Sequence, residues 1–220
     1  MAPTRGPGQR AGLSRPAVLA AARELLEQDG EDALSVRAVA RRLGVAPNAI
    51  YSHVDGRAAL VDGVLDDLLG KVPAPSAGRP AAAALADLLL AAYDLLVSHP
   101  WLVSLYLARQ GARGENAVRL GAVMDERLAA AGVAPDAAAD ARRVLLVHLM
   151  GSAAFAASGA GLDAGVDAAH ARALFTRSLD WLLAGLVTPC LTRARQDPGI
   201  VQRPQPFSSA RVGRARPLLQ

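Results

Sequence analysis

The sequence is poor in cysteine and in aromatic residues, and each shortage excludes a class of structure. Cys190 is the one cysteine among 220 residues, so the chain can form no internal disulfide and no multi-thiolate zinc site. Aromatic residues make up 4% of the chain, while alanine, leucine and valine supply most of its 52% hydrophobic content. Because alanine and leucine are strong helix formers, this composition predicts an all-α fold rather than a β-sandwich.

Long hydrophobic runs are also scarce. The first thirteen residues lack the apolar core of a signal peptide, which predicts a cytoplasmic protein. Residues 144–162 carry no formal charge over a length that could span a bilayer. However, alanine, glycine and serine dominate the second half of this stretch, and Arg142 and Arg143 adjoin its start. We therefore expect a buried helix here and no membrane partner.

Motifs for catalysis and for metal binding are missing. The sequence contains no zinc-binding H-E-x-x-H and no phosphate-cradling glycine-rich loop, and its four histidines are scattered. The net charge of +4 arises mainly after residue 190, where several arginines accompany Asp197 alone, so charge by itself does not indicate a nucleic-acid partner. We expect neither an enzyme nor a bound metal or other cofactor.

Capping and turn residues predict where the helices begin and end. The predicted helices lie between Ser14 and Gly30, between Ser35 and Gly44, from Pro47 to about Val54 and from Arg57 to about Leu69, and then at about 80–97, 101–110, 114–131, 136–158 and 167–187. A stretch rich in proline, glycine and serine at 71–80 marks the main boundary. The helix pattern and this boundary together predict a flexible arm at 1–13, one helical domain at 14–70, a second at 71–188, and a disordered basic tail at 189–220.

Residues 35–54 (SVRAVARRLGVAPNAIYSHV) show the pattern of a helix-turn-helix. Ala40 leaves room for the second helix to approach, and Gly44 can take the left-handed conformation that ends the first. The inner angle is expected to bury Val39, Leu43, Val45 and Ile50, and the outer face to carry Asn48, Ala49, Ser52 and His53. Such an outer face can enter a major groove, although an ordinary helical hairpin has the same pattern.

The run from Ser14 to about Leu69 resembles the N-terminal DNA-binding domain of the TetR family of transcriptional regulators. The resemblance rests on LSVRAVARRLGVAPNAIYSHVDGRAALVDGVL, with Leu-Gly-Val at the turn, Ile-Tyr-x-His-Val in the third helix and Gly-Arg-x-x-Leu opening the fourth. HPWL at 99–102 is similar to tetracycline-repressor-type C-terminal regions. The resemblance covers about 14–187. It implies a three-helix DNA-binding domain joined through a fourth helix to a C-terminal ligand-binding and dimerisation bundle.

The resemblance implies a role for individual residues in DNA recognition. Arg37 matches a position that reads a base or holds a phosphate, and an arginine can bind guanine O6 and N7 together. Asn48 and Ala49 lie at the base-reading start of the recognition helix, where they could contact adenine and a thymine methyl group. The expected DNA-binding residues are Ser35, Arg37, Pro47, Asn48, Ala49, Tyr51, Ser52, His53 and Arg57.

Other matching positions contact the DNA backbone. Tyr51 and His53 match the family's phosphate-contacting residues, and Arg57 matches a basic residue that anchors the backbone; such contacts fix register without reading sequence. Tyr51 could instead close the small core. Three positions depart from the family pattern: Ala46 lacks the hydroxyl of a usual cap, Ser52 stands where an aromatic residue is common, and Asp55 replaces a frequent lysine.

The last two predicted helices supply a candidate dimer interface. The resemblance implies that they pair with their copies in a four-helix bundle, and small residues along them allow close approach. The candidate interface residues are Val144, Val147, Gly151, Phe175, Ser178 and Leu182. The alternative is that both helices serve only as intramolecular core.

The resemblance also implies a small-molecule pocket in the C-terminal domain. Binding of an effector there would change the angle of the two DNA-binding heads through the fourth helix. The candidate ligand-binding residues are Tyr93, Trp101, Tyr106, Arg109, Met124, His148, Met150 and Phe155. Core packing is the alternative for each of them, and the small number of polar groups suggests a mostly apolar effector.

Together these features predict a homodimeric, ligand-responsive regulator that binds a double-stranded DNA operator and acts as a repressor. The alternative is a helical protein–protein adaptor that kept the fold without specific DNA binding. Steeply salt-dependent DNA binding would distinguish the regulator from the adaptor.

Overall fold

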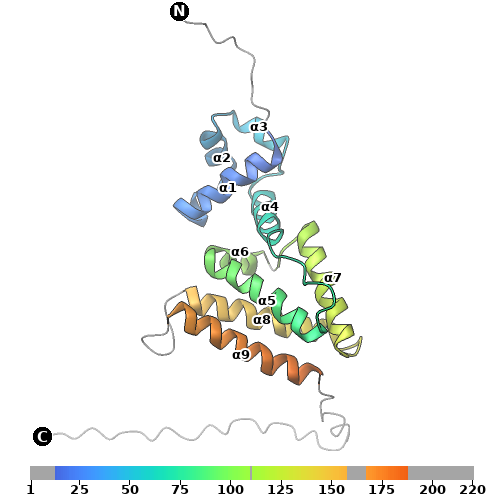
Figure 1. Ribbon diagram of the computed structural model, residues 1–220. Coiled ribbons are helices and arrows are strands. Elements are labelled where there is room, and N and C mark those ends of the chain that lie inside the picture. The colour runs from blue at the N-terminus through green and yellow to red at the C-terminus, as the bar shows by residue number, and fades with distance from the viewer. Residues whose placement is uncertain (1–12, 110, 158–166, 188–220) are drawn as a thin grey trace, which may run out of the picture. The chain divides into compact units, whose positions relative to one another are not determined.

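A computed structural model describes residues 13–109, 111–157 and 167–187, which form helices and no strand (Figure 1). The elements are α1 (Arg15–Asp29), the short 3-10 helix η1 (Glu31–Ala33), α2 (Val36–Leu43), α3 (Pro47–Tyr51), α4 (Arg57–Leu69), α5 (Ala81–Ser98), α6 (Trp101–Ala108), α7 (Glu115–Ala130), α8 (Ala138–Ala157) and α9 (Ala168–Val187). The all-α prediction is confirmed, and each long helix begins and ends within a few residues of its expected bounds. The predicted arm at 1–13, apart from Leu13, and the predicted tail at 189–220 lie outside the described residues.

Side-chain caps begin the first two helices, as the sequence predicts. The Ser14 hydroxyl accepts a hydrogen bond from the Ala17 backbone N–H at 3.4 Å, and the Ser35 hydroxyl accepts one from Ala38 at 3.1 Å. Each bond satisfies a backbone donor that has no partner within the helix. Gly30, with φ of 80°, ends α1.

The N-terminal helices form a small bundle in which α1 contacts α2 and α4, and α2 contacts α3. Val18 of α1, Val39 of α2 and Ile50 of α3 are fully buried. Gly63 permits the close approach of α4 to α1, because a Cβ atom there would lie 2.6 Å from Leu19 Cδ2. This bundle holds α2 and α3 in place.

In the C-terminal part, α5 contacts α6, α7, α8 and α9. By length and mean hydropathy (18 residues, 1.7), α5 is the one helix among the described residues that could cross a membrane. Leu85, Leu88 and Leu89 on α5 are buried among the helices that surround it. Burial inside a helical bundle therefore accounts for its apolar character. The stretch expected to form a buried helix from 144 is α8, which buries Leu145 and Leu149 and leaves its other face open.

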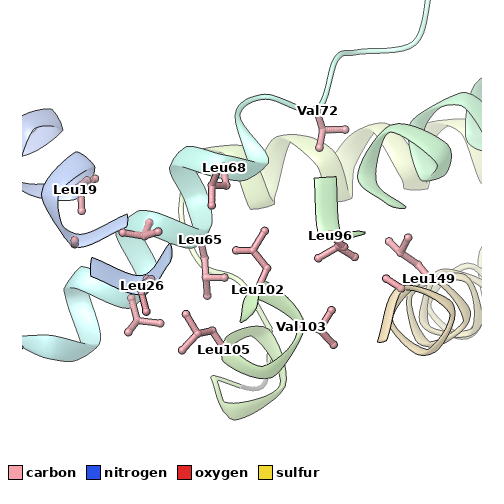
Figure 2. Close-up of a cluster of buried hydrophobic side chains, with 14 of the residues drawn as sticks. Leu19, Leu26, Leu65, Leu68, Val72, Leu96, Leu102, Val103, Leu105 and Leu149 are labelled. Atoms are coloured by element: carbon pink, nitrogen blue, oxygen red, sulfur yellow. The ribbon is translucent and has the colours of Figure 1, made fainter. Parts of the chain in front are cut away.

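The fourth helix, α4, belongs to both groups of helices. It contacts α1 on one side and α6 and α7 on the other. Figure 2 shows Leu65 of α4 among Leu26 of α1 and Leu102 and Leu105 of α6, and all four side chains belong to one buried cluster. The apolar core is thus continuous through α4. No helix forms at 71–80, and the domain boundary expected there stays a prediction.

Candidate DNA-binding surface and ligand cavity

The turn between α2 and α3 has the conformation that its sequence predicts. Gly44 has φ of 66° and ψ of 30°, a left-handed conformation that favours glycine. The Val45 backbone N–H then bonds to the Ala40 carbonyl at 3.0 Å, which closes the end of α2. Ala40 is 1% exposed, so a larger side chain there would force α2 and α3 apart. Leu43 and Val45 pack against the core from the edge of the turn.

The start of α3 is open to solvent. Pro47 and Asn48 are exposed, Ala49 is half-buried, and Arg37 at the start of α2 is exposed beside Ser35. Tyr51 is 55% exposed, which argues against a role in closing the core. Ala46, directly before α3, makes no capping hydrogen bond, in agreement with the loss expected from its missing hydroxyl.

Three of the expected contact residues have partners within the chain, and the first is Ser35, whose hydroxyl caps α2. The Ser52 hydroxyl donates to the Ala49 carbonyl at 2.7 Å, so it turns back onto its own helix. The Arg57 guanidinium donates to the backbone carbonyls of Leu34 and Glu31, both at 3.1 Å. Arg57 therefore ties the start of α4 to the segment that leads into α2. Sequence spacing did not reveal this positioning role, because the contact joins residues more than twenty positions apart.

Arg42 also holds the helix-turn-helix in place. Its guanidinium donates to Glu24 Oε2 at 2.8 Å and to Gln28 Oε1 at 3.0 Å, both on α1. This contact fixes α2 against α1. Arg41, in contrast, is exposed on the same helix.

A cavity of about 570 Å³ lies between α4, α5, α6, α7 and α8. Its walls are largely leucine, valine and alanine, among them Leu65, Leu68 and Leu69 of α4. Tyr106, Met124 and Met150 line it, as the sequence analysis expected. The size is typical of a site for a small organic molecule.

Five of the residues expected to bind a ligand do not line this cavity: Tyr93, Trp101, Arg109, His148 and Phe155. Tyr93 stacks on Phe175 with ring centroids 4.4 Å apart, and His148 also stacks on Phe175, with ring centroids 5.3 Å apart. These aromatic rings fill the contact between α5, α8 and α9. The cavity wall is instead mostly aliphatic, with Tyr106 as its one aromatic residue.

The other three have different surroundings. Trp101 packs edge-on against His99 with ring centroids 5.9 Å apart. The Arg109 guanidinium donates two hydrogen bonds to the carboxylate of Asp62 on α4. Phe155 is 59% exposed on α8. None of these three side chains faces the cavity, because only one side of each helix faces it.

The expected dimer residues separate into two faces. Val144 and Val147 are 45% and 66% exposed on α8. Phe175, in contrast, is 2% exposed on a buried stripe of α9 with Leu179 and Leu183 at four-residue spacing. Phe175 is therefore corrected from an interface residue to a core residue.

The exposed face of α9 contains a different apolar pair. Leu174 and Trp181 are 47% and 69% exposed, and Ser178 lies between them at helical spacing, half-buried like Leu182. Gly151 on α8 is half-buried, and a Cβ atom at this glycine would meet no atom within 4 Å. Trp181, the most exposed large apolar residue of this face, was not among the residues expected at the interface.

The structure combines an exposed helix-turn-helix with a helical second domain that contains an apolar cavity, and one helix joins the two. These features define a helix-turn-helix protein with a helical second domain. Residues 18–64 match the family model described as bacterial regulatory proteins, tetR family. The matched residues run from α1 into α4 and include the whole helix-turn-helix.

The chain is also similar to a named relative. An HTH-type transcriptional regulator from Saccharopolyspora erythraea is 34% identical over 125 residues, which cover 54% of this chain and 51% of the relative. The aligned part thus spans about half the length of that relative.

Two solved structures share the fold over most of the chain. BioQ from Mycobacterium smegmatis has a TM-score of 0.70 at 25% identity over 80% of this chain and 98% of BioQ, and BioQ has also been solved with its natural double-stranded DNA operator. A TetR variant from Acinetobacter baumannii AYE in complex with minocycline has a TM-score of 0.66 at 28% identity, over 79% of this chain and 96% of that one.

Proposed function

We propose that the protein is a sequence-specific, DNA-binding transcriptional regulator, and that it acts as a cytoplasmic repressor released from its operator by a small-molecule effector. The observation that carries the proposal is the exposed start of α3, held by the left-handed turn at Gly44. Arg37 and Asn48 are exposed there, and both side chains can form paired hydrogen bonds with a base edge. The structure of BioQ with its operator supports a DNA partner.

The proposed domain division follows from these surfaces. Residues 14–70 form the DNA-binding domain, with Ser35, Pro47, Ala49, Tyr51, Ser52 and His53 close to the reading face. Residues 71–188 form the effector-binding and dimerisation domain. The segments at 1–13 and 189–220 are a basic arm and a basic tail.

Effector binding would reach the DNA-binding domain through α4. Leu65, Leu68 and Leu69 of α4 form part of the cavity wall, and Arg57 at the other end of α4 holds the segment before α2. A ligand that fits one position of α4 better than another shifts the balance between DNA-competent and DNA-incompetent arrangements. The complex of the Acinetobacter baumannii TetR variant with minocycline supports a small-molecule effector.

Polar contacts hold the cavity end of α4. Asp66 Oδ1 accepts a hydrogen bond from the Ala117 backbone N–H at 3.0 Å, in the first turn of α7. Arg119 of α7 donates to the carbonyls of Leu69 and Val72 at 3.3 and 3.2 Å. A shift of α7 around a bound ligand would therefore pull directly on α4.

The functional unit would be a homodimer. A two-fold operator requires two reading heads, and the exposed apolar faces of α8 and α9 fit a self-complementary interface. Val144, Val147, Leu174 and Trp181 would form its centre, with Gly151 allowing close approach of the helices.

Fluorescence anisotropy with DNA from beside the protein's own gene tests the proposal. We expect Arg37→Ala and Asn48→Ala to weaken binding by about 5- to 150-fold, because each removes contacts to base edges. Arg79→Ala is the control for loss of one positive charge, since Arg79 pairs with Asp87 at an exposed site outside the helix-turn-helix. Equal, weak and salt-sensitive binding by all four proteins would contradict specific recognition and favour the adaptor.

A further inference from the structure

Three polar side chains line the otherwise aliphatic cavity: Tyr106, Asp125 and Arg142. Arg142 Nη1 on α8 donates a hydrogen bond to Asp125 Oδ2 on α7 at 2.5 Å. The two side chains remain 37% and 46% exposed, so the ion pair lies at the edge of the cavity rather than in its depth. Arg142 is close enough to Tyr106 to influence it electrostatically, and the remaining wall is apolar.

The polar edge carries no net charge. Asp125 and Arg142 neutralise each other, and no other carboxylate or basic side chain is among the residues that line the cavity. An anionic ligand would have to take Arg142 away from Asp125 and leave that carboxylate beside it. A cationic ligand would leave Arg142 in the same position. Either ligand would also have to bring its charge against the apolar wall, which is unfavourable for an ion without a partner.

The phenol of Tyr106 indicates whether this environment favours or disfavours a negative charge. Burial raises the pKa of the Tyr106 phenol, and the positive charge of Arg142 opposes this rise without cancelling it. The apolar surroundings thus disfavour a negative charge more strongly than Arg142 favours one. The phenol remains a neutral hydroxyl that can both donate and accept a hydrogen bond.

We propose that the cavity binds an uncharged, predominantly apolar organic molecule whose one polar edge is hydrogen-bonded by Tyr106 and the intact Asp125–Arg142 pair. The cavity of about 570 Å³ sets the size of this ligand, and its aliphatic wall sets its chemistry. This inference rests on the proposed function, because it names the class of effector that the regulator would sense.

A pair of fluorescent probes with the same ring system tests the charge preference. N-phenyl-1-naphthylamine is uncharged, and 8-anilino-1-naphthalenesulfonate is the same molecule with an added sulfonate. Both become fluorescent when they enter an apolar site. We expect the uncharged probe to bind the wild-type protein at least about tenfold more tightly, which is about 1.4 kcal/mol. Equal binding, tighter binding of the sulfonate, or no binding of either probe would overturn the proposal.

Asp125→Asn tests the role of the ion pair. The substitution leaves the charge of Arg142 without its carboxylate, so we expect affinity for the sulfonate probe to rise about tenfold while affinity for the uncharged probe stays the same. Asp87→Asn is the matched control, because Asp87 forms an equivalent pair with Arg79 and does not line the cavity. An unchanged sulfonate affinity in Asp125→Asn, or an equal rise in Asp87→Asn, would overturn the assignment.

Gly121 provides a way to fill the cavity without unfolding the protein. It lies within α7 and lines the cavity, and a Cβ atom there would meet only Arg142 Nη1, at 3.8 Å. Gly121→Leu also improves helix propensity, so the variant should fold. We expect it to abolish binding of the uncharged probe, whereas Gly121→Ala keeps it. Probe binding that survives in Gly121→Leu would place the probe elsewhere and overturn the proposal.

DNA binding measured on the same samples separates this inference from the proposed function. Loss of all specific operator binding with an intact probe preference would contradict the regulator and leave the ligand class standing. Normal operator binding with no preference for the uncharged probe would contradict the ligand class alone.

Discussion

Arg109, directly after the end of α6, donates two hydrogen bonds to the carboxylate of Asp62 on α4, Nε to Oδ1 at 2.8 Å and Nη2 to Oδ2 at 2.7 Å. The planar guanidinium and the carboxylate face each other in the paired geometry that gives such contacts their directionality. This pair joins the helix next to the cavity with the helix that supports the DNA-binding domain. It fixes the distance between them more firmly than apolar contacts alone.

Breaking this pair should weaken communication rather than DNA binding. In Asp62→Asn we expect operator affinity without effector to stay near the wild-type value. The effector concentration that releases half of the DNA should change by about 2- to 30-fold, the range typical of residues along a coupling route. The change would be measured by adding increasing amounts of an effector to the protein–operator complex and following the release of DNA. Arg79→Ala, which removes another surface ion pair, should have no effect. An unchanged release curve in Asp62→Asn would show that the pair is not part of the coupling.

The N-terminal caps of α2 and α3 predict opposite changes in stability when a serine is removed from one cap and added at the other. Ser35→Ala removes the hydrogen bond to the Ala38 N–H and should lower the free energy of unfolding by about 1 kcal/mol. Ala46→Ser should raise it by up to about the same amount, because Ala46 has an extended backbone at the cap position and no side-chain acceptor. Urea unfolding of both variants measures the difference. A loss of stability in Ala46→Ser would contradict the cap geometry at α3.

The sequence could predict those parts of the structure that depend on residues close together along the chain. Ser14, Ser35, Gly44 and Pro47 mark helix ends through contacts within four residues, and the structure confirms each of them. The contact of Arg57 with Leu34 depends on how the start of α4 lies against the segment before α2, which no local pattern contains.

The cavity was only partly predicted for a similar reason. Its leucines have the same helical spacing as the leucines of the core, so a sequence cannot distinguish a residue beside a cavity from one that fills it. Among the candidate ligand residues, Tyr106 lines the cavity, whereas Tyr93 stacks on Phe175 in the core. The neutral edge formed by Asp125 and Arg142 joins two helices and was not visible from spacing.

His148 predicts a dependence of stability on pH. Its Nε2 lies 2.7 Å from the Ser178 hydroxyl, which donates its own proton to the Phe175 carbonyl, so the neutral imidazole carries its proton on Nε2. Burial lowers the pKa of His148, because the surroundings disfavour the imidazolium. Below about pH 6.5 the unfolded chain therefore binds a proton more readily than the folded protein does. The free energy of unfolding should fall as the pH falls through this range.

Replacement of His148 should reduce this dependence. In His148→Gln the additional loss of stability between about pH 7.5 and about pH 5.5 should be smaller than in the wild-type protein, because a glutamine side chain does not titrate. Urea unfolding at both pH values measures the difference, and His170→Gln, at an exposed position on α9, is the control. An identical pH profile in the wild type and His148→Gln would rule out His148 as the source.

The exposed face of α8 and α9 predicts the oligomeric state. Val147 is 66% exposed and Trp181 is 69% exposed, and two-fold symmetry would bury both residues twice in a dimer. Val147→Asp places a carboxylate at that position in each copy, which should weaken the dimer by at least about 100-fold. Sedimentation velocity over a concentration series would show a shift from twice the 22.7 kDa chain mass towards the monomer.

Leu107→Asp is the matched control for this test, because Leu107 is 60% exposed on α6 and lies outside the α8 and α9 face. It should leave the dimer intact. Operator affinity should fall with the dimer in Val147→Asp, since one reading head binds half of a two-fold site. A Val147→Asp protein that remains dimeric, or a Leu107→Asp protein that dissociates, would place the interface on another face of the chain.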